Sequence, residues 1–238
     1  MNVVPLFLVV NAVTRHGSDD TLERRRAIVG AALALLDESG FDRLSLRRVA
    51  SHLEMHAPGL YWYIESKQEL IDLMAKAILD EGFATVPPLV DGQTWKDWLI
   101  DLACTTRQTL LAHRDGARVV ASSYVLHTGS LSPVIEHALE LLESAGFERL
   151  VALGGTLTLL RYATGIALDE QASPLQPRAS SVDEQLAATP ALPIDPAQFP
   201  RMADAMRRVH EGKLRNRERV FRWGAQLIVR GLAESLHH

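Results

Sequence analysis

The sequence HAPGLYWYIESKQELI, at His56–Ile71, concentrates aromatic residues in a chain that has few of them. Its three consecutive aromatics are Tyr61, Trp62 and Tyr63. Aromatic residues make up only 6% of the 238 residues, while hydrophobic residues make up 47% and charged residues 23%, as in an ordinary globular protein. Such a run indicates either a helix junction packed in a core or a surface that binds a partner.

Helix signals surround this run on both sides. Upstream, an amphipathic helix is expected from Thr21 to Gly40, since glycine commonly ends a helix in the left-handed conformation. Ser45 is a suitable N-cap for a short helix over 46–54. After a break of three residues, Pro58 suits the first turn of a second short helix over 58–64.

Downstream, Ser66 followed by Glu69 is a capping-box pattern that predicts a helix over 67–83. Helical periodicity continues to the C-terminus, and no strand-like alternation is present. Six prolines predict a long mobile loop over 172–200. The further helices are expected over 94–113, 114–124, 132–146, 148–170, 201–212 and 218–236.

The predicted fold is all-α, with about nine to ten helices in two domains. Residues 21–68 form an N-terminal three-helix domain with a helix-turn-helix, and residues 69–238 form a larger helical domain. The apolar start MNVVPLFLVVNAV lacks a preceding basic residue and is interrupted by Pro5, which is atypical of a signal peptide. We therefore expect residues 1–20 to be a disordered extension or the product of a misplaced start codon.

Composition excludes some classes of protein. The single cysteine, Cys104, allows no disulfide within the chain and fits a reducing, cytoplasmic location. No segment after the N-terminus is expected to be long and apolar enough to cross a membrane. The net charge of −4 disfavours a uniformly basic surface but allows a local basic patch.

A helix-break-helix that leans on a longer first helix is a helix-turn-helix, whose second short helix enters the DNA major groove. Pro58 and Gly59 keep the start of that helix slim, so that its backbone can approach the duplex. Tyr61 and Trp62 can then contact sugar and phosphate, and Lys67 can contact a further phosphate. The predicted DNA-contacting residues are Arg47, His56, Pro58, Gly59, Tyr61, Trp62, Tyr63 and Lys67.

The stretch DRLSLRRVASHLEMHAPGLYWYIESKQELI, at 42–71, resembles the DNA-binding domain of the TetR (tetracycline repressor) family. The motif LYW followed by Lys67 and Leu70 carries this resemblance. Further matches to the tetracycline-repressor branch are TWKDWLIDLACTTRQTLLAHRDGARV at 94–119, SAGF at 144–147 and LDEQ at 168–171. Glu54 departs from the family pattern, since it stands where a left-handed glycine is usual.

The resemblance implies a homodimeric transcriptional repressor that binds a near-palindromic double-stranded DNA operator and releases it when a small-molecule effector binds the larger domain. Apolar helices over 148–170 and 217–236 would then form a four-helix dimer seam. The predicted dimer-interface residues are Leu153, Leu157, Leu160, Val220, Trp223, Leu227 and Ile228.

Tetracycline-binding members of the family hold a magnesium–drug complex with histidines, an asparagine and a carboxylate of the other subunit. The resemblance places those positions at Phe83, Leu102, Val120 and Asp169, of which only the last can bind a hard cation. We therefore expect no metal, no cofactor and an effector that is lipophilic or aromatic. The predicted ligand-binding residues are Phe83, Trp98, Leu102, Thr106, Val120, Tyr124, His127 and Asp169.

Two other functions stay open at this point. The N-terminal three-helix domain, called the head below, is electrically neutral, because it has seven basic and seven acidic residues between Thr21 and Leu70. One alternative is therefore an adaptor or ligand-binding protein that has lost DNA binding. A helical enzyme is the other, although the sequence contains no nucleophile–base signature, phosphate-binding loop or metal-binding HExxH motif. We expect that the protein is not an enzyme.

Overall fold

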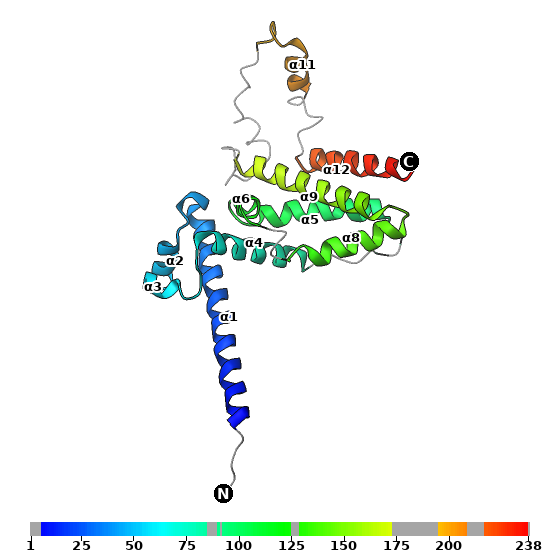
Figure 1. Cartoon of the computed structure of the whole chain (residues 1–238). Helices are drawn as coiled ribbons and strands as arrows, with labels where there is room; N and C mark the ends of the chain where they lie inside the picture. The colour runs from blue at the N-terminus through cyan, green and yellow to red at the C-terminus, as the bar shows by residue number, and fades with distance from the viewer. Residues whose placement is uncertain are drawn as a thin grey trace. The chain divides into compact units, whose positions relative to one another are not determined.

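A computed structural model describes residues 6–84, 90, 92–124, 129–172, 195–208 and 217–237, with side chains from Thr21 onward. The described residues form ten α-helices and two 3-10 helices, without a strand, which confirms the all-α prediction (Figure 1). The helices are α1 (Leu6–Ser39), η1 (Phe41–Arg43), α2 (Leu46–His52), α3 (Ala57–Leu60), α4 (Lys67–Phe83), α5 (Trp95–Leu111), α6 (Gly116–Ala121), α8 (Ser132–Ser144), α9 (Arg149–Ala172), α11 (Pro200–Arg208), α12 (Arg217–Glu234) and η3 (Ser235–His237).

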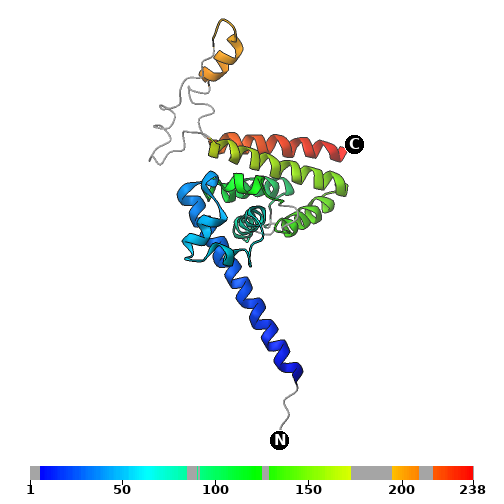
Figure 2. The same cartoon turned by 60° about the vertical axis from the view of Figure 1, so that its left-hand side comes forward.

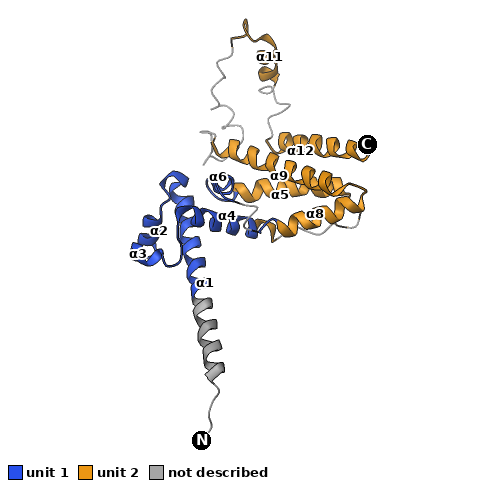
Figure 3. Ribbon diagram, viewed as in Figure 1, with its two compact units in different colours: residues 1–81, 112–131 blue, residues 82–111, 132–238 orange. Residues whose placement is uncertain are grey.

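The chain divides into two compact units, shown in different colours in Figure 3. Unit 1 consists of residues 1–81 and 112–131, so it contains the helix-turn-helix together with α6. In it α2 packs against α1, and α3 packs against α2. Its core holds side chains that are fully buried: Ile28, Leu36, Leu60, Ile64 and Leu70.

Three predicted helix boundaries are confirmed by the hydrogen bonds of unit 1. Gly40 follows the last residue of α1 with a φ of 82°, and its N–H donates to the Leu36 carbonyl at 2.8 Å. The Ser45 hydroxyl accepts a hydrogen bond from the Arg48 N–H at the start of α2. The Ser66 hydroxyl accepts from the Glu69 N–H at 3.1 Å, which is the first of the two bonds of a capping box, while the Glu69 carboxylate accepts from the Glu65 N–H.

The short helices α3 and α6 are among the helices that are shorter than the sequence predicts. The second short helix ends at Leu60 instead of 64, because the N–H groups of Tyr63 and Ile64 share the Leu60 carbonyl and the chain continues as a turn. The helix expected over 114–124 begins only at Gly116, because Asp115 before it adopts a left-handed φ of 56°.

Unit 2 consists of residues 82–111 and 132–238 and is built around α5, α8, α9 and α12. α9 packs against each of the other three helices. Both views show α9 and α12 side by side along most of their length (Figures 1 and 2). The largest buried side chains of this unit are Trp98, Leu99, Leu102 and Phe221.

α9 corrects one expectation from the sequence. The helix Arg149–Ala172 is long and apolar enough, by length and composition alone, to cross a membrane. A third of its most apolar window is buried against other parts of the chain. The core helix of a soluble protein passes the same test, so this finding gives only weak support for a membrane span.

Several predictions about domain limits fall partly outside the described residues. The helix expected from Thr21 begins at Leu6 in the structure, so its predicted start is wrong. Residues 1–5 and the side chains of residues 6–20 are not described, and the assignment of residues 1–20 to an extension or to a misplaced start codon stays a prediction. Residues 173–194 of the predicted Pro-rich loop over 172–200 are likewise not described. The predicted helix-turn-helix domain, 21–68, lies wholly within unit 1.

Candidate nucleic-acid interface and ligand pockets

The two adjacent arginines of α2 have different environments. Arg48 is half-buried, and its guanidinium donates to the Ser39 hydroxyl at 2.7 Å and to the Arg43 carbonyl at 3.0 Å. These bonds hold the start of α2 against the end of α1. Arg47 projects into solvent, so of the two it is the one available to a nucleic acid.

The aromatic run after α3 is anchored from beneath and exposed above. Leu60 and Ile64 are completely buried, whereas the side chain of Trp62 is 87% exposed and that of Tyr61 is 55% exposed. Tyr63 is half-buried. Tyr61 and Trp62 are therefore not core residues of this chain, and they present a large aromatic surface with hydrogen-bonding tips.

The residues at the N-terminus of α3 leave open space beside the backbone, which would allow a duplex to approach closely. His56 is the N-cap residue, and its side chain makes no capping hydrogen bond. Pro58 lies in the first turn and is exposed. A Cβ added to Gly59 would meet no atom of the chain within 4 Å, so the space beside this residue is open.

Glu54 in the turn has the left-handed conformation that the family pattern assigns to glycine, with a φ of 54°. Replacing it with glycine removes this strain, so we expect Glu54→Gly to raise the free energy of unfolding by about 1 kcal/mol. Urea unfolding of the purified protein measures the change. Glu54→Ala, which removes the carboxylate but keeps a Cβ, should give no gain; equal gains for both variants would contradict the strain argument.

The N-terminus of α4 is fixed by a network around Glu69. This carboxylate forms an ion pair with Arg25 of α1 and accepts a hydrogen bond from the Glu65 N–H at 2.6 Å. Ser66 caps the helix from the other side. Lys67, the first residue of α4, is exposed, and its ammonium lies 5.6 Å from the centre of the Phe41 ring.

The segment that contains α6 is hydrogen-bonded to the helix-turn-helix at its first end. Asp37 of α1 accepts from the Arg114 N–H at 2.9 Å and lies 3.0 Å from the His113 ring nitrogen Nδ1. Asp115 accepts from the Phe41 N–H at 2.8 Å. The segment is therefore joined to α1 and η1 by several polar contacts within unit 1.

The other end of this segment is joined to α4. Gln68 donates to the Ser122 carbonyl at 3.0 Å, and the Tyr124 N–H donates to Asp72 at 3.0 Å. Gln68 also donates to Asp72 at 3.0 Å, so these groups form one network. A displacement of the α6 segment would therefore disturb α1 and α4 together.

The residues predicted to bind an effector lie in different places. Trp98, Leu102 and Thr106 are buried on α5, and Trp98 contacts the His137 ring edge-on at 5.1 Å. Trp98 and Leu102 line a cavity of about 280 Å³ that also involves Arg222 of α12. The remaining predicted positions are Phe83, half-buried in α4; Val120, buried in α6; Tyr124, exposed; Asp169, exposed on α9; and His127, which lies outside the described residues.

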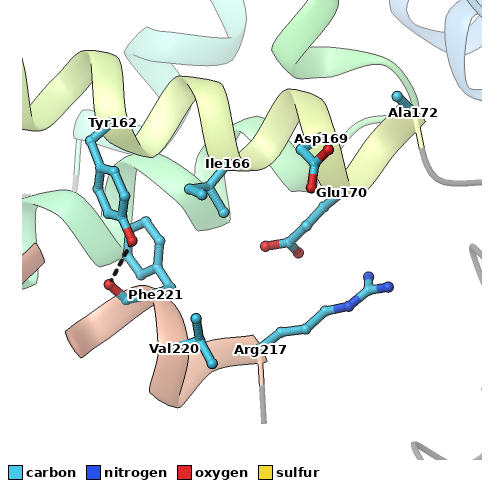
Figure 4. Close-up of a pocket in the computed structure, with 8 residues that line it drawn as sticks. All are labelled: Tyr162, Ile166, Asp169, Glu170, Ala172, Arg217, Val220 and Phe221. Atoms are coloured by element: carbon cyan, nitrogen blue, oxygen red, sulfur yellow. Dashed lines mark hydrogen bonds between the residues drawn. The ribbon is translucent and has the colours of Figure 1, made fainter. Parts of the chain in front are cut away.

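Asp169 lines a larger pocket of about 450 Å³ between α9 and α12 (Figure 4). The side chains of Asp169 and Glu170 point from α9 toward α12. At the other end, the Tyr162 hydroxyl donates to the Phe221 carbonyl at 3.1 Å, and the two rings stack. The other lining residues are Ile166, Ala172, Arg217 and Val220.

A charged cluster behind this pocket joins α5, α9 and α12. Arg107 of α5 donates two hydrogen bonds of 2.8 Å to the Glu170 carboxylate and one of 2.7 Å to Glu218. Its guanidinium also lies 5.2 Å from the Phe221 ring centre. The hydrogen bonds to Glu170 raise the pKa of Arg107 above its ordinary value. Sequence reasoning missed this cluster, although an arginine within the apolar pattern of α5 is a signal for a buried ion pair.

Cys104 borders the smaller cavity and is buried. Burial raises the pKa of its thiol to about 11, so the reactive thiolate is scarce at neutral pH. Within the described residues, no group of three or more His, Cys, Asp or Glu side chains could hold a metal ion.

An apolar surface extends over α9 and α12. Trp223 is 54% exposed, and Leu227, Leu150 and Val151 are exposed as well. Leu153, Leu157, Val220 and Ile228 are half-buried, while Leu160 is almost completely buried inside the chain. The predicted seam residues other than Leu160 thus retain surface that a second chain could cover.

Comparison with known proteins agrees with this architecture. Residues 28–74 match the family described as bacterial regulatory proteins, tetR family, and residues 87–236 match the tetracyclin repressor-like C-terminal domain. The class C tetracycline repressor protein of Escherichia coli is 32% identical over 212 residues, which cover 88% of this chain and 90% of that protein.

Solved structures give the same result. The Streptomyces coelicolor TetR family protein ActR in complex with (S)-DNPA superposes with a TM-score of 0.67 at 28% identity, over 89% of this chain and 98% of ActR. BioQ with its natural double-stranded DNA operator superposes with a TM-score of 0.61 at 25% identity, over 88% of this chain and 98% of BioQ. On the matches to both family domains and to a relative along almost its whole length, the chain belongs to the TetR family of transcriptional regulators.

Proposed function

We propose that this protein is a homodimeric repressor that binds a near-palindromic operator through α2, α3 and the start of α4. Members of the TetR family are ligand-responsive DNA-binding repressors and form homodimers. The observation that carries the proposal here is the exposure of Tyr61 and Trp62 beside fully buried Leu60 and Ile64. Aromatic residues are scarce in this chain, and these two lie exposed to solvent at positions that a DNA backbone would cover.

The neutral charge of the head is compatible with this role. Arg48 is engaged in holding α2 against α1, and Glu69 is engaged with Arg25. Arg47 and Lys67 are the exposed cations of the predicted DNA-contacting residues. DNA affinity would thus rest on a few placed charges rather than on a general positive field.

Salt dependence tests the DNA-binding proposal. Binding of the purified protein to a duplex from the DNA upstream of its own gene is measured by fluorescence anisotropy at several salt concentrations. We expect Lys67→Gln to reduce the slope of log affinity against log salt by about 1.

We expect Tyr61→Ala to lower the affinity for the same duplex by roughly tenfold or more. The matched control is Phe199→Ala, an exposed aromatic before α11, and an equal loss for this variant would contradict the proposal.

We also propose that the effector is a lipophilic or aromatic molecule rather than a magnesium–tetracycline complex. Leu102 and Val120, at two positions that the resemblance assigns to metal-binding side chains, are apolar and buried. Neither side chain can coordinate a hard cation. Of the assigned positions, only Asp169 offers an oxygen ligand.

Tetracycline should therefore fail to release the protein from its operator. We expect no change in operator affinity when tetracycline and millimolar magnesium are added together, because a single carboxylate cannot hold the complex. The anisotropy assay gives the readout, with a tetracycline repressor and its own operator as the positive control. Release by tetracycline that depends on magnesium would contradict this proposal.

We propose in addition that the protein is cytoplasmic and is not an enzyme. TetR-family regulators are soluble cytoplasmic DNA-binding proteins and are generally not enzymes. Supporting this, the lone cysteine is buried and its raised pKa makes it a poor nucleophile. Turnover of a bound effector would overturn the non-enzyme proposal.

A further inference from the structure

Phe41 and Asp42 of η1 lie between α6 and the DNA-contacting end of α4. The Arg118 guanidinium of α6 donates to the Asp42 carboxylate at 2.7 Å and lies 4.7 Å from the centre of the Phe41 ring. The Lys67 ammonium lies 5.6 Å from the centre of the same ring. Two cations from different helices therefore converge on one aromatic ring, and one of them, Arg118, also pairs with the neighbouring Asp42 carboxylate.

Both cations lower the pKa of the Asp42 carboxylate. The hydrogen bond and the charge of Arg118 lower the pKa of Asp42, and the charge of Lys67 lowers it further. Within the part of the chain that the structure describes, Asp42 accepts its side-chain hydrogen bond from Arg118. Phe41, whose ring the Lys67 ammonium approaches, is the residue next to Asp42 in η1, and the lysine side chain is long and flexible.

We propose that Asp42 exchanges ion-pair partners. Arg118 pairs with Asp42 while α6 is packed against the head, and Lys67 pairs with Asp42 once α6 moves away. This inference rests on the proposed function, because it assigns Lys67 a phosphate contact. A lysine that pairs with Asp42 is less available to the DNA backbone, so operator affinity falls. Arg118 acts here as a positioning residue that keeps Asp42 away from Lys67.

The position of Arg118 explains how an effector can drive the exchange. Arg118 lies on a helix of six residues that also carries Val120, one of the predicted effector contacts. A ligand that shifts this short helix displaces both residues together. The ion pair is exposed to water, so its contribution is modest and can be outweighed by the binding of a ligand.

The test removes Arg118 without any effector. We expect Arg118→Gln to weaken binding to the duplex from the DNA upstream of the gene by roughly three- to fivefold. Adding Asp42→Asn to this variant should restore affinity to within about twofold of the wild-type protein, because the competing carboxylate is gone. In a Lys67→Gln background, Arg118→Gln should change affinity by less than about twofold.

Two controls separate partner exchange from general effects of charge and folding. Asp80→Asn removes one exposed carboxylate of α4, which pairs with Lys76, and should not restore the Arg118→Gln variant. Arg118→Lys keeps a cation near Asp42 and should bind DNA almost as tightly as the wild-type protein. Circular dichroism melts show whether each variant is folded.

The outcomes distinguish this inference from the proposed function. If the wild-type protein binds the duplex but the effects of Arg118→Gln and Lys67→Gln simply multiply, the partner exchange is wrong and the repressor proposal stands. Rescue by Asp80→Asn to the same degree as by Asp42→Asn also overturns the exchange. If the wild-type protein does not bind the duplex at low salt, both proposals fail together.

Discussion

Replacing Arg107 with alanine is expected to lower the free energy of unfolding by about 3 kcal/mol or more, since it breaks a buried ion pair and leaves a carboxylate without its partner. The side chains of Arg107 and Glu170 are only 10% and 13% exposed. Their two parallel hydrogen bonds link α5 to α9, and Glu218 links the same guanidinium to α12. Urea unfolding at a fixed protomer concentration measures the loss.

A double replacement distinguishes the buried charge from the loss of packing. Arg107→Met combined with Glu170→Leu fills the space with apolar groups, so it should recover most of the stability that Arg107→Ala loses. Arg149, which pairs with Glu143 on the surface, provides the exposed comparison, and Arg149→Ala should leave the unfolding free energy unchanged within error. Equal effects of Arg107→Ala and Arg149→Ala would contradict this account of the cluster.

Adding one methyl group at Gly82 is expected to destabilise unit 2 by about 2 kcal/mol, because the methyl would overlap buried atoms. A Cβ at this position would lie 2.0 Å from the Thr109 hydroxyl oxygen and 2.6 Å from the Thr109 Cβ. The Thr109 Cβ cannot rotate away, so the two backbones must separate. Thermal or urea unfolding of Gly82→Ala gives the measurement.

The matched control variant, Gly30→Ala, should change the stability in the opposite direction. Gly30 lies on the exposed side of α1, and a Cβ there would meet no atom within 4 Å. Gly30→Ala should therefore raise stability by about 0.5–1 kcal/mol through the higher helix propensity of alanine. Destabilisation by Gly30→Ala, or a gain from Gly82→Ala, would show that contact with Thr109 is not the deciding factor.

The local features of the head could be predicted because their causes are local. Gly40, Ser45 and Ser66 mark helix ends through their own backbone freedom or hydroxyl groups, and each does so in the structure. The exposure of Trp62 could be inferred from the helix-turn-helix spacing together with the LYW motif. The shorter α3 could not, since it depends on two N–H groups competing for the Leu60 carbonyl.

The longer-range features could not be read from the sequence. Arg107 meets Glu170 and Glu218 across 63 and 111 positions of the chain, and no periodic pattern specifies such a meeting. The docking of α6 on the head depends in the same way on Asp37 and Asp42, 76 positions from their partners. Such contacts are fixed by how helices pack, which composition and spacing do not determine.

Footprinting of the purified protein on the DNA upstream of its own gene tests the central claim most directly. The account predicts a protected near-palindrome with half-sites about 34–36 Å apart or a multiple of this, matching successive major grooves. The protection should disappear when Tyr61 and Trp62 are both replaced with alanine, while the Phe199→Ala control retains it. A folded dimer that protects no upstream DNA at low salt, or whose protection survives the loss of both aromatics, would contradict the account.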